Sequence, residues 1–534
     1  MKAPRPAVAV CACLLLAMVT MIILPPWSGR RVLLRLDRSG TDFGPNSLKM
    51  STTLSAVKGA AATEETRLAD FSGNPYKVGP TIRVAPTIPE AEEHIAVDPS
   101  DSKNLVAAVI DLSRGQGSQT LRYAFSTQNG AADAWKGDFV NLFGNLALRT
   151  SDGNFWAADV DPAVVIDGNQ NVYLVQLYKD VFARDNGELK QIQGTTGIYV
   201  SRQDFSKLGD DGFKQGKNRT VPVAPPDLDP TKQIAEDKPW IAVDQCSGDV
   251  YVAWAHFGHR GTAKESSQIY FSRSTNQGMT WSPVVKLSRL SPTTSDSGAQ
   301  VAAMACGEVF VAWVETSNTT RPGELFSSRL ILAVSDDNGQ HFGIPKPITQ
   351  SFLSVFTPFP DAFYKVNAFP SMAVDLRNNS LALVYSAALN NDPSNPNTQV
   401  KFILSTDNGQ TFSEPQTIND VAAGEHFFPA ITTDAEGVYH ACWFDTRNSQ
   451  RDNRLLDVYA TYTKDGGATF GKNAKVTQPM NPRPGLNVGS ADFIGDYIGI
   501  AAGGNFAHPV WSNISKNGAG ELTGSLQTAT ITLP

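Results

Sequence analysis

A hairpin motif recurs along the chain from about residue 90 to the C-terminus. Each copy is an apolar run, a short polar turn and a second apolar run, and the clearest copy reads WIAVDQCSGDVYVAW. The copies begin near His94, Pro162, Trp240, Ala299, Phe369, Phe428 and Tyr497, about 60–77 residues apart. Continuous Val, Ile and Ala runs, rather than strict alternation, predict strands that are buried on both faces. The chain is therefore expected to fold by repetition of one all-β unit.

A second motif, Ser/Thr-x-Asp/Asn-x-Gly-x-x-aromatic, follows several of these hairpins. Its glycine can adopt a positive φ, its Asp or Asn can bond the amides of its own turn, and its aromatic ring can pack back on the sheet. The motif therefore predicts a structural turn rather than a catalytic acid. Its residues are Ser274, Asn276, Gly278 and Trp281; Ser335, Asp337, Gly339 and Phe342; Ser405, Asp407, Gly409 and Phe412; and Thr463, Asp465, Gly467 and Phe470.

Together the two motifs predict four antiparallel strands per repeat, which is the composition of a β-propeller blade. We expect seven blades over residues 76–534, with six as the alternative because the last hairpin matches the pattern least well. The last repeat stops after three strands, and residues 78–85 form an unpaired strand ahead of the first repeat. Pairing this N-terminal strand with the last repeat would close the ring.

The first 75 residues lack the repeat. Residues 7–24 form an apolar run that follows Lys2 and Arg5, and about 18 residues are just enough to cross a bilayer as a helix. We expect residues 1–27 to be a single-pass signal anchor, with a cleaved signal peptide as the alternative, and residues 28–75 to be a flexible tether. The propeller is then membrane-anchored or secreted, on the extracytoplasmic side, and a monomer.

Charge and cysteine content narrow the partners further. The net charge is −7, with no long basic run, so a nucleic-acid partner is not expected. Cys246 and Cys306 fall in the same inner-hairpin turn of adjacent repeats, which predicts a disulfide between blades in an oxidising compartment. Cys442 lies inside an apolar run and is expected to be a free core thiol.

The Ser/Thr-x-Asp-x-Gly-x-Thr-Trp/Phe motif is the Asp box, and the chain resembles the sialidase-like superfamily of Asp-box (BNR-repeat) β-propellers. The resemblance implies that the Asp boxes lie at the blade periphery, away from the ligand site. It also implies sialidase chemistry, with three arginines around a sialate carboxylate, a Tyr nucleophile polarised by a Glu, and an Asp acid/base. The family's first arginine lies in a Phe/Tyr-Arg-Ile-Pro motif, and the nearest segment here, IRVAP around Arg83, departs from it at two positions.

Polar residues gather before the first strands and after the second strands, where propellers usually bind ligands; Glu92, Lys238 and Asp496 are among them. The catalytic candidates are Glu425, Asp445 and Tyr497, and the ligand-binding candidates are Arg114, Arg260, Arg447, Asp237 and His426. Three arginines on one face could clamp an anion; alternatively, they form ion pairs with neighbouring carboxylates.

The carboxyl groups of Glu425 and Asp445 could hydrolyse a glycoside, or bind Ca²⁺ through oxygen ligands. No other cofactor is expected, and no metal-ligand set is predicted. The expected function is recognition of a glycan or another extracellular ligand on this loop-rich face. A glycoside hydrolase of sialidase type is the first alternative, and a non-catalytic protein-binding scaffold is the second.

Overall fold

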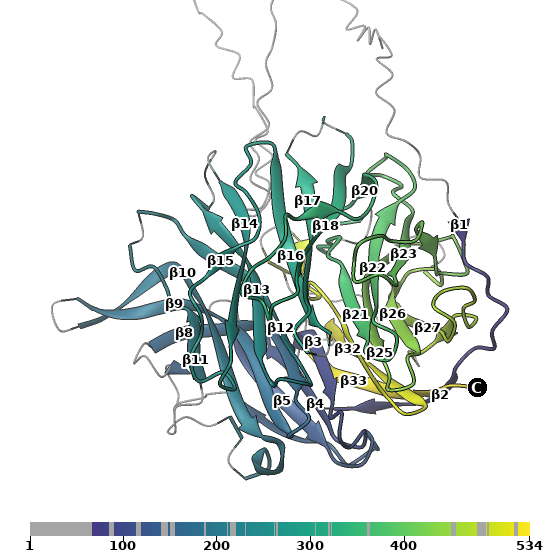
Figure 1. Ribbon diagram of the computed structural model, residues 1–534, viewed down its shortest axis with the longest axis horizontal. Helices are drawn as coiled ribbons and strands as arrows, with labels where there is room; N and C mark the ends of the chain where they lie inside the picture. Colours follow the sequence, from purple (N-terminus) through teal and green to yellow (C-terminus); the bar gives the residue numbers. More distant parts are fainter. Residues whose placement is uncertain are drawn as a thin grey trace, which may run out of the picture.

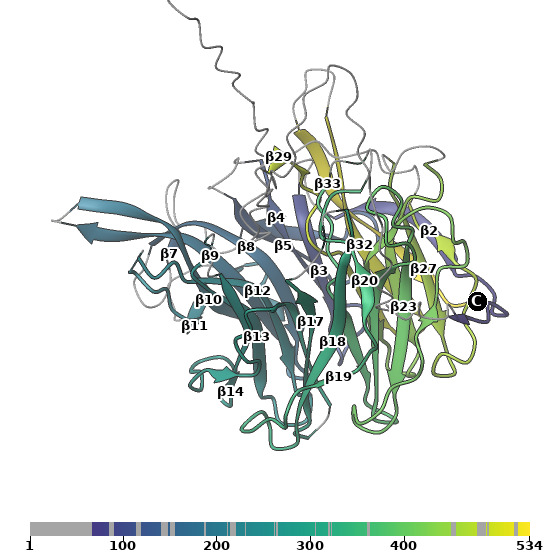
Figure 2. The same cartoon turned by 90° about the horizontal axis from the view of Figure 1, so that it is seen from above.

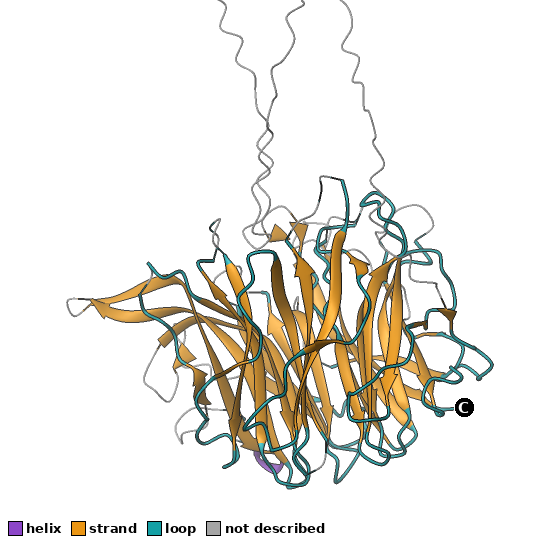
Figure 3. Ribbon diagram, turned by 45° about the horizontal axis from the view of Figure 1, so that its top comes forward, coloured by secondary structure: helices purple, strands orange, loops and turns teal. Residues whose placement is uncertain are grey.

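The computed structural model describes most of the chain from residue 67 onward. The described residues are 67–84, 90–113, 119–139, 148–149, 155–185, 188–210, 212–213, 220–229, 231–260, 262, 265–304, 306–318, 321, 323–359, 362, 364–449, 455–477, 487–488, 491–516 and 522–534. Within these ranges every regular element is a β-strand except one short 3-10 helix, η1 (Phe205–Lys207). The predicted all-β class is therefore confirmed for the described part of the chain (Figure 3).

Most strands form four-stranded antiparallel meanders, which we name units 1 to 7 in chain order. Unit 1 consists of β3 (Glu90–Val97), β4 (Leu105–Asp111), β5 (Thr120–Ser126) and β6 (Lys136–Phe139). Unit 2 consists of β8 (Phe155–Ile166), β9 (Asn171–Asp185), β10 (Glu188–Asp204) and β11 (Thr220–Ala224), with β7 (Leu148–Arg149) beside β8. Unit 3 consists of β12 (Ala235–Val243), β13 (Val250–Gly258), β14 (Ser266–Ser274) and β15 (Val285–Lys286).

Units 4 and 5 are joined into one sheet by β20 (Phe352–Ser354), which pairs with a strand of each. Unit 4 consists of β16 (Thr294–Ala303), β17 (Val309–Ser317), β18 (Phe326–Ser335) and β19 (Lys346–Pro347), and unit 5 of β21 (Ser371–Asp375), β22 (Ser380–Ala388), β23 (Thr398–Ser405) and β24 (Gln416–Thr417). Unit 6 consists of β25 (His426–Thr433), β26 (Tyr439–Asp445), β27 (Asp457–Thr463) and β28 (Ala474–Lys475). A separate small hairpin is formed by β29 (Asn487–Val488) and β30 (Ala491–Asp492).

Unit 7 combines the two ends of the described chain. It consists of β31 (Gly499–Gly503), β32 (Phe506–Lys516), β33 (Leu522–Thr532) and β2 (Lys77–Arg83). β2 is antiparallel to β33, with a register that runs from Lys77 opposite Thr532 to Arg83 opposite Gln527. The predicted pairing of an N-terminal strand with the last repeat is confirmed.

The second strands are the most deeply buried elements. Every residue of β4, β22 and β26 is buried, and the side chains of Trp254, Trp313, Trp443 and Trp511 are at most 1% exposed. These strands have apolar neighbours on both faces because the sheets of adjacent units pack on each side. The prediction from the continuous apolar runs is confirmed.

The first strands of the units contact one another in chain order, from β3 to β8 and on through β12, β16, β21 and β25 to β31. β31 in turn contacts β3. Successive units therefore lie side by side around a common centre, and the first and last coloured segments are neighbours (Figure 1). This arrangement is propeller-like.

The segment before β2 is attached to units 5 and 6. β1 (Arg67–Leu68) pairs in parallel with β24, Gly73 bridges Gly471, and the Tyr76 hydroxyl lies 2.5 Å from His440 Nδ1. The tether expected over residues 28–75 is therefore bound to the sheets from residue 67 onward. No helix in the described ranges is long and apolar enough to span a membrane, and the anchor expected at residues 1–27 lies outside them.

One hairpin extends beyond the rest of the sheets (Figure 2). Its strands, β9 and β10, have 15 and 17 residues and stay paired as far as Asp185 opposite Glu188. Trp156, Tyr178 and Tyr199 form a buried aromatic cluster at its base.

The four Asp-box motifs form one shared turn. In each motif the Ser or Thr hydroxyl accepts a hydrogen bond from the glycine amide at 2.8–2.9 Å, and the Asp or Asn side chain accepts from the amide four residues later at 2.8–2.9 Å. Hydrogen bonds from Thr411 lower the pKa of Asp407 to about 2. The carboxylates of these motifs are bound to their own turns.

Cys246 and Cys306 form a disulfide with a Cα–Cα distance of 5.2 Å. It joins the inner-hairpin turns of units 3 and 4. Cys442 is a free, fully buried thiol in β26.

Candidate functional site

Five first strands carry a β-bulge near the point where they enter their sheets. The bulges contain a residue with positive φ: Glu92 (60°), Asp161 (54°), Lys238 (49°), Gly298 (65°) and Phe428 (50°). A positive φ in a residue other than glycine costs about 1 kcal/mol or more, and such strain together with bulges is concentrated near functional sites. The bulges turn side chains of units that are far apart in sequence toward one another.

The bulge side chains meet around the ammonium group of Lys238. Lys238 Nζ lies 2.7 Å from Glu92 Oε1, 2.6 Å from Asp161 Oδ1 and 2.8 Å from Asp496 Oδ2. Asp496 also binds Lys365 Nζ at 2.7 Å. These five residues, which we call the axial cluster, join units 1, 2 and 3 to the segments that lead into units 5 and 7. Their side chains are 1–19% exposed.

The two carboxyl groups that share Lys238 with Asp496 have opposite pKa shifts. Burial, reinforced by the charge of Asp161, raises the pKa of Glu92 well above its usual value. Burial would also raise the pKa of Asp161, but the charge of Lys238 and a hydrogen bond with Glu92 bring it below the usual value. Burial therefore favours the protonated form of Glu92, whereas the charge of Lys238 favours the ionised form of Asp161.

A cavity of about 30 Å³ adjoins the cluster, lined by Lys238, Trp240, Phe369, Phe428 and Tyr497 among others. Ligand pockets usually measure about 300–1,000 Å³, so this cavity has room for water and not for a sugar ring. Tyr497 donates to the carbonyl of Pro162 at 2.8 Å, and burial raises the pKa of its phenol well above the usual value. The phenol therefore stays protonated and acts as a structural donor here.

The carboxylates of Glu425 and Asp445 serve different loops. Glu425 accepts hydrogen bonds from the amide and hydroxyl of Thr398, both at 2.7 Å, and burial raises its pKa. Asp445 is fully buried and accepts from Trp443 Nε1 at 3.0 Å and from Arg447 Nε at 2.9 Å. The two groups are bound by different loops, those of units 5 and 6.

The candidate arginines in the described ranges are paired with carboxylates. Arg447 binds Asp445 and Asp420, and its guanidinium lies 4.0 Å from the centre of the Tyr459 ring. Its side chain is only 8% exposed. This geometry corresponds to the ion-pair alternative, since the neighbouring carboxylates occupy the fork that an anionic ligand would need.

At the edge of the axial cluster, Arg260 NH2 lies 3.2 Å from Asp237 Oδ2, with 34% of the arginine side chain exposed. His426 is buried, 2.7 Å from the Thr398 carbonyl and 3.4 Å from Asp445 Oδ2, and burial lowers its pKa. Arg114 lies outside the described residues. The structure therefore brings Asp237, Arg260 and Tyr497 near the axis and places Glu425, His426, Asp445 and Arg447 in a separate network.

A second polar group lies beside Arg260 in unit 3. His256 Nδ1 is 2.9 Å from Glu236 Oε1, and its ring stacks on Tyr270 with centroids 4.3 Å apart. The sequence reasoning counted Glu236 and His256 among the polar residues of the loop-rich face without choosing them as site candidates, and it did not select Tyr270. It also did not select Asp161 or Lys365, which follow no motif; Glu92, Lys238 and Asp496 did share a recognisable position before a first strand.

No group of three or more His, Cys, Asp or Glu in the described ranges is arranged to hold a metal ion.

No protein-family model matches the chain, and no curated protein matches it. Similar solved structures include the Hadza microbial sialidase Hz136, with 13% identity, a TM-score of 0.42, and coverage of 88% of this chain and 98% of that one. The GH93 α-L-arabinofuranosidase of Fusarium graminearum has 13% identity and a TM-score of 0.42, covering 75% and 98%. A protein of unknown function from Dyadobacter fermentans has 11% identity and a TM-score of 0.40, covering 86% and 99%. With TM-scores below 0.5, these neighbours assign neither a family nor a substrate to this chain.

Proposed function

We propose that this chain is a seven-bladed extracytoplasmic β-propeller that recognises an extracellular glycan on the face above the axial cluster. The observation that carries the proposal is the set of strained bulges that gathers charged side chains from several units at one place. Buried ionisable groups with shifted pKa values, held by strained backbone, mark functional sites more often than other surfaces. The circuit of first-strand contacts and the β2–β33 pairing support a closed ring.

Charge favours a neutral glycan over a sialoside. Arg260 and Arg447 each have a carboxylate partner. Neither of these two candidate arginines is therefore free to bind a sialate carboxylate. The partly exposed groups beside the cluster are instead Asp237 and Arg260, and the His256–Tyr270 stack lies farther out in the same unit. Such mixed polar and aromatic groups suit hydroxyls and the C–H face of a sugar.

Glycoside hydrolysis is the second candidate, favoured by the Glu92 and Asp161 pair. Acid and base roles are assigned to carboxyl groups whose surroundings push their pKa values apart, and these two shift in opposite directions. Both bind the same Lys238 nitrogen, so their nearest oxygens are separated by no more than the sum of two hydrogen bonds. Because both are buried, hydrolysis requires the side chains around the small cavity to move aside.

The chain's placement outside the cytoplasm rests on residues 1–27 as the anchor and on the disulfide between units 3 and 4, which suits an oxidising compartment. The stretch that follows the anchor would hold the propeller at a short distance from the membrane.

The proposal is tested by glycan-array binding and calorimetry with Arg260→Gln. We expect neutral glycans to bind wild type and to lose about tenfold or more in affinity in this variant, because an exposed charged hydrogen-bond donor contributes about 1.5–3 kcal/mol. The control is Arg329→Gln, which removes another partly exposed arginine–carboxylate pair, the one with Glu315 in unit 4. Binding of sialosides alone, or equal binding by Arg260→Gln, would contradict the proposal. A turnover screen on chromogenic glycosides with Glu92→Gln separates binding from hydrolysis.

A further inference from the structure

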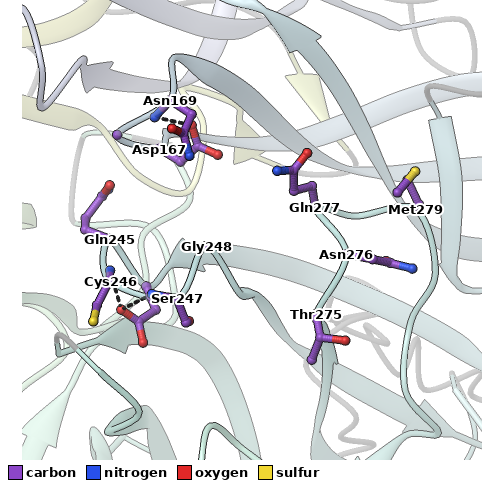
Figure 4. A pocket seen from close by; sticks show the side chains of 12 residues that line it. Asp167, Asn169, Gln245, Cys246, Ser247, Gly248, Thr275, Asn276, Gln277 and Met279 are labelled. Carbon is purple, nitrogen blue, oxygen red and sulfur yellow. Dashed lines mark hydrogen bonds between the residues drawn. The ribbon is translucent and has the colours of Figure 1, made fainter.

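A polar cleft lies at the opposite ends of the first strands from the axial cluster. It has a volume of about 400 Å³, within the range of ligand pockets. Three turns enclose it (Figure 4): the β8–β9 turn of unit 2, the β12–β13 turn of unit 3, and the Asp-box turn after β14. The lining residues, which define the basal cleft, are Asp167, Gly168, Asn169, Asp244, Gln245, Cys246, Ser247, Gly248, Thr275, Asn276, Gln277 and Met279.

The equivalent gap is closed by a backbone hydrogen bond in two other units. In unit 1 the Asn129 amide donates to the Lys103 carbonyl at 2.9 Å, and in unit 4 the Asn338 amide donates to Gly307 at 2.8 Å. Gln277 has the same position and a similar φ of 59° in unit 3, but it lines the cleft. This bond joins the two turns in units 1 and 4, whereas in unit 3 the two turns face each other across the cleft.

A disulfide borders the cleft. It ties the β12–β13 turn to unit 4 through Cys246 and Cys306, and the Cys306 amide also donates to Asp244 Oδ1 at 3.2 Å. The turn is thus held against the next unit. Both half-cystines are exposed to solvent, so the covalent bond forms part of the cleft's accessible rim.

The two carboxylates of the lining are already bound. Asp167 accepts from the amides of Asn169 and Asn171 at 2.9 and 2.8 Å, and Asp244 accepts from the Cys246 amide at 2.8 Å. The other polar side chains of the lining are neutral amides and hydroxyls, those of Asn169, Gln245, Ser247, Thr275, Asn276 and Gln277, beside the thioether of Met279, which is 57% exposed. Among them, the Gln245 amide donates to the Ile166 carbonyl at 3.0 Å, and the Ser247 hydroxyl accepts from the Asp249 amide at 3.2 Å. The lining contains no lysine, arginine or histidine.

This chemistry selects the ligand. Amide and hydroxyl groups both donate and accept hydrogen bonds, as sugar hydroxyls do, and an exposed thioether offers an apolar contact for a ring's C–H face. An anion would meet two carboxylates without a cation. We propose that the basal cleft binds a neutral saccharide of one or two rings, at a site separate from the axial face.

The test is saturation-transfer NMR and calorimetry with methyl glucoside, methyl galactoside, methyl N-acetylglucosaminide, cellobiose, lactose and chitobiose. The blocking variant is Asn169→Trp, because the Asn169 side chain is exposed and its amide, which holds the turn, is kept. Glu436→Trp is the matched control, since the Glu436 amide donates to Asp434 in the same turn position of unit 6. Gln277→Gly removes one lining amide and tolerates the positive φ.

We expect saturable binding of at least one of these sugars by wild type and by Glu436→Trp, and a loss of about tenfold or more in Asn169→Trp. Gln277→Gly should weaken binding severalfold, because one hydrogen bond contributes about 0.5–1.5 kcal/mol. Arg260→Gln should leave this binding unchanged, so failure of the axial proposal is distinguished from failure here. Absence of binding across the panel, or full binding by Asn169→Trp, overturns the basal site.

Discussion

The first strands hold carboxylates at both ends, and the two ends neutralise them differently. At the axial end, Asp161 and Asp496 depend on Lys238, which comes from another unit. At the basal end, Asp167 and Asp244 accept hydrogen bonds from amides two residues along the chain. The axial arrangement needs the whole fold to bring its partners together, whereas each basal turn supplies most of its own.

The two kinds of carboxylate therefore have different roles in the structure. A carboxylate whose hydrogen-bond donors all lie in its own turn can recur in every unit, because the turn does not depend on residues of neighbouring units. A carboxylate that is satisfied across units fixes their relative positions, and its removal leaves another charge buried. Substitutions at the axial end and at the basal end of the first strands, made separately, distinguish the two roles.

The largest effect is expected for Lys238→Met. This change leaves Asp161 and Asp496 buried without their shared ammonium group, and loss of one partner from a buried ion network costs about 3–5 kcal/mol. Urea unfolding followed by tryptophan fluorescence measures the loss. Lys232→Met is the control, because the Lys232–Asp227 pair is exposed and should make no measurable contribution. Equal stability of the two variants would show that the axial cluster does not hold the units together.

The next effect is expected at the basal end from Cys246→Ser combined with Cys306→Ser. The disulfide closes a loop of 60 residues in the unfolded chain, and removing such a link costs about 2–4 kcal/mol. Thermal unfolding of the double variant should match that of reduced wild type. A double variant as stable as oxidised wild type would mean that the local turns suffice for the basal end without a covalent link.

The free energy of unfolding should depend on pH through two buried glutamates at the axial end of unit 1. Burial raises the pKa of Glu90 and of Glu93 to about 8, so the folded chain binds protons that the unfolded chain has released. Their stabilising effect is complete below the unfolded pKa near 4.5 and is lost as pH rises through about 8. Between pH 6.5 and 8 the loss is about 2 kcal/mol for each residue.

Burial lowers the pKa values of His94 and His508 to about 4. These histidines favour the folded state above the unfolded histidine pKa near 6.5 and lose that contribution as pH falls through about 4. Between about pH 4.5 and 6.5 the contributions of the two histidines and the two glutamates largely cancel, so the unfolding free energy should change little there and fall as pH rises from 6.5 to 8. In Glu93→Gln, the unfolding free energy measured by urea titration should fall less steeply between pH 6 and 8.5 than in wild type. An unchanged slope would contradict the raised pKa of Glu93.

The repeating parts of the fold were predictable because they depend on local pattern. The apolar runs indicated strands buried on both faces, and the unpaired strand before the first repeat indicated its partner in the last one. The axial cluster was not predictable, because the contact between Lys238 and Asp496 depends on bulges whose direction is set by packing between units. The sequence around Glu425 and Asp445 does not show whether their carboxylates hold a loop or face a ligand.

The binding of residues 67–76 to units 5 and 6 was not indicated either. Much of this attachment uses main-chain groups, such as the Ala69 amide that donates to the Thr417 carbonyl at 3.0 Å. Backbone hydrogen bonds carry no signature of side-chain type. The Tyr76–His440 contact could have been predicted only if unit 6 had already been known as the binding partner of this segment.

The smallest effect is expected in the Asp boxes. The box of unit 3 has Asn276 where the others have Asp, so it shows which bonds an asparagine makes in this turn. Asp407 accepts from the Thr411 amide at 2.8 Å, and Asn276 makes the equivalent bond with Thr280 at 2.9 Å. Asp407→Asn should therefore leave thermal stability nearly unchanged, whereas Asp407→Ala should cost about 1 kcal/mol because the turn loses its acceptor. If the Asn variant were as destabilised as the Ala variant, charge rather than the local hydrogen bond would hold the turn. The contrast between locally and distantly neutralised carboxylates would then not extend to the Asp boxes.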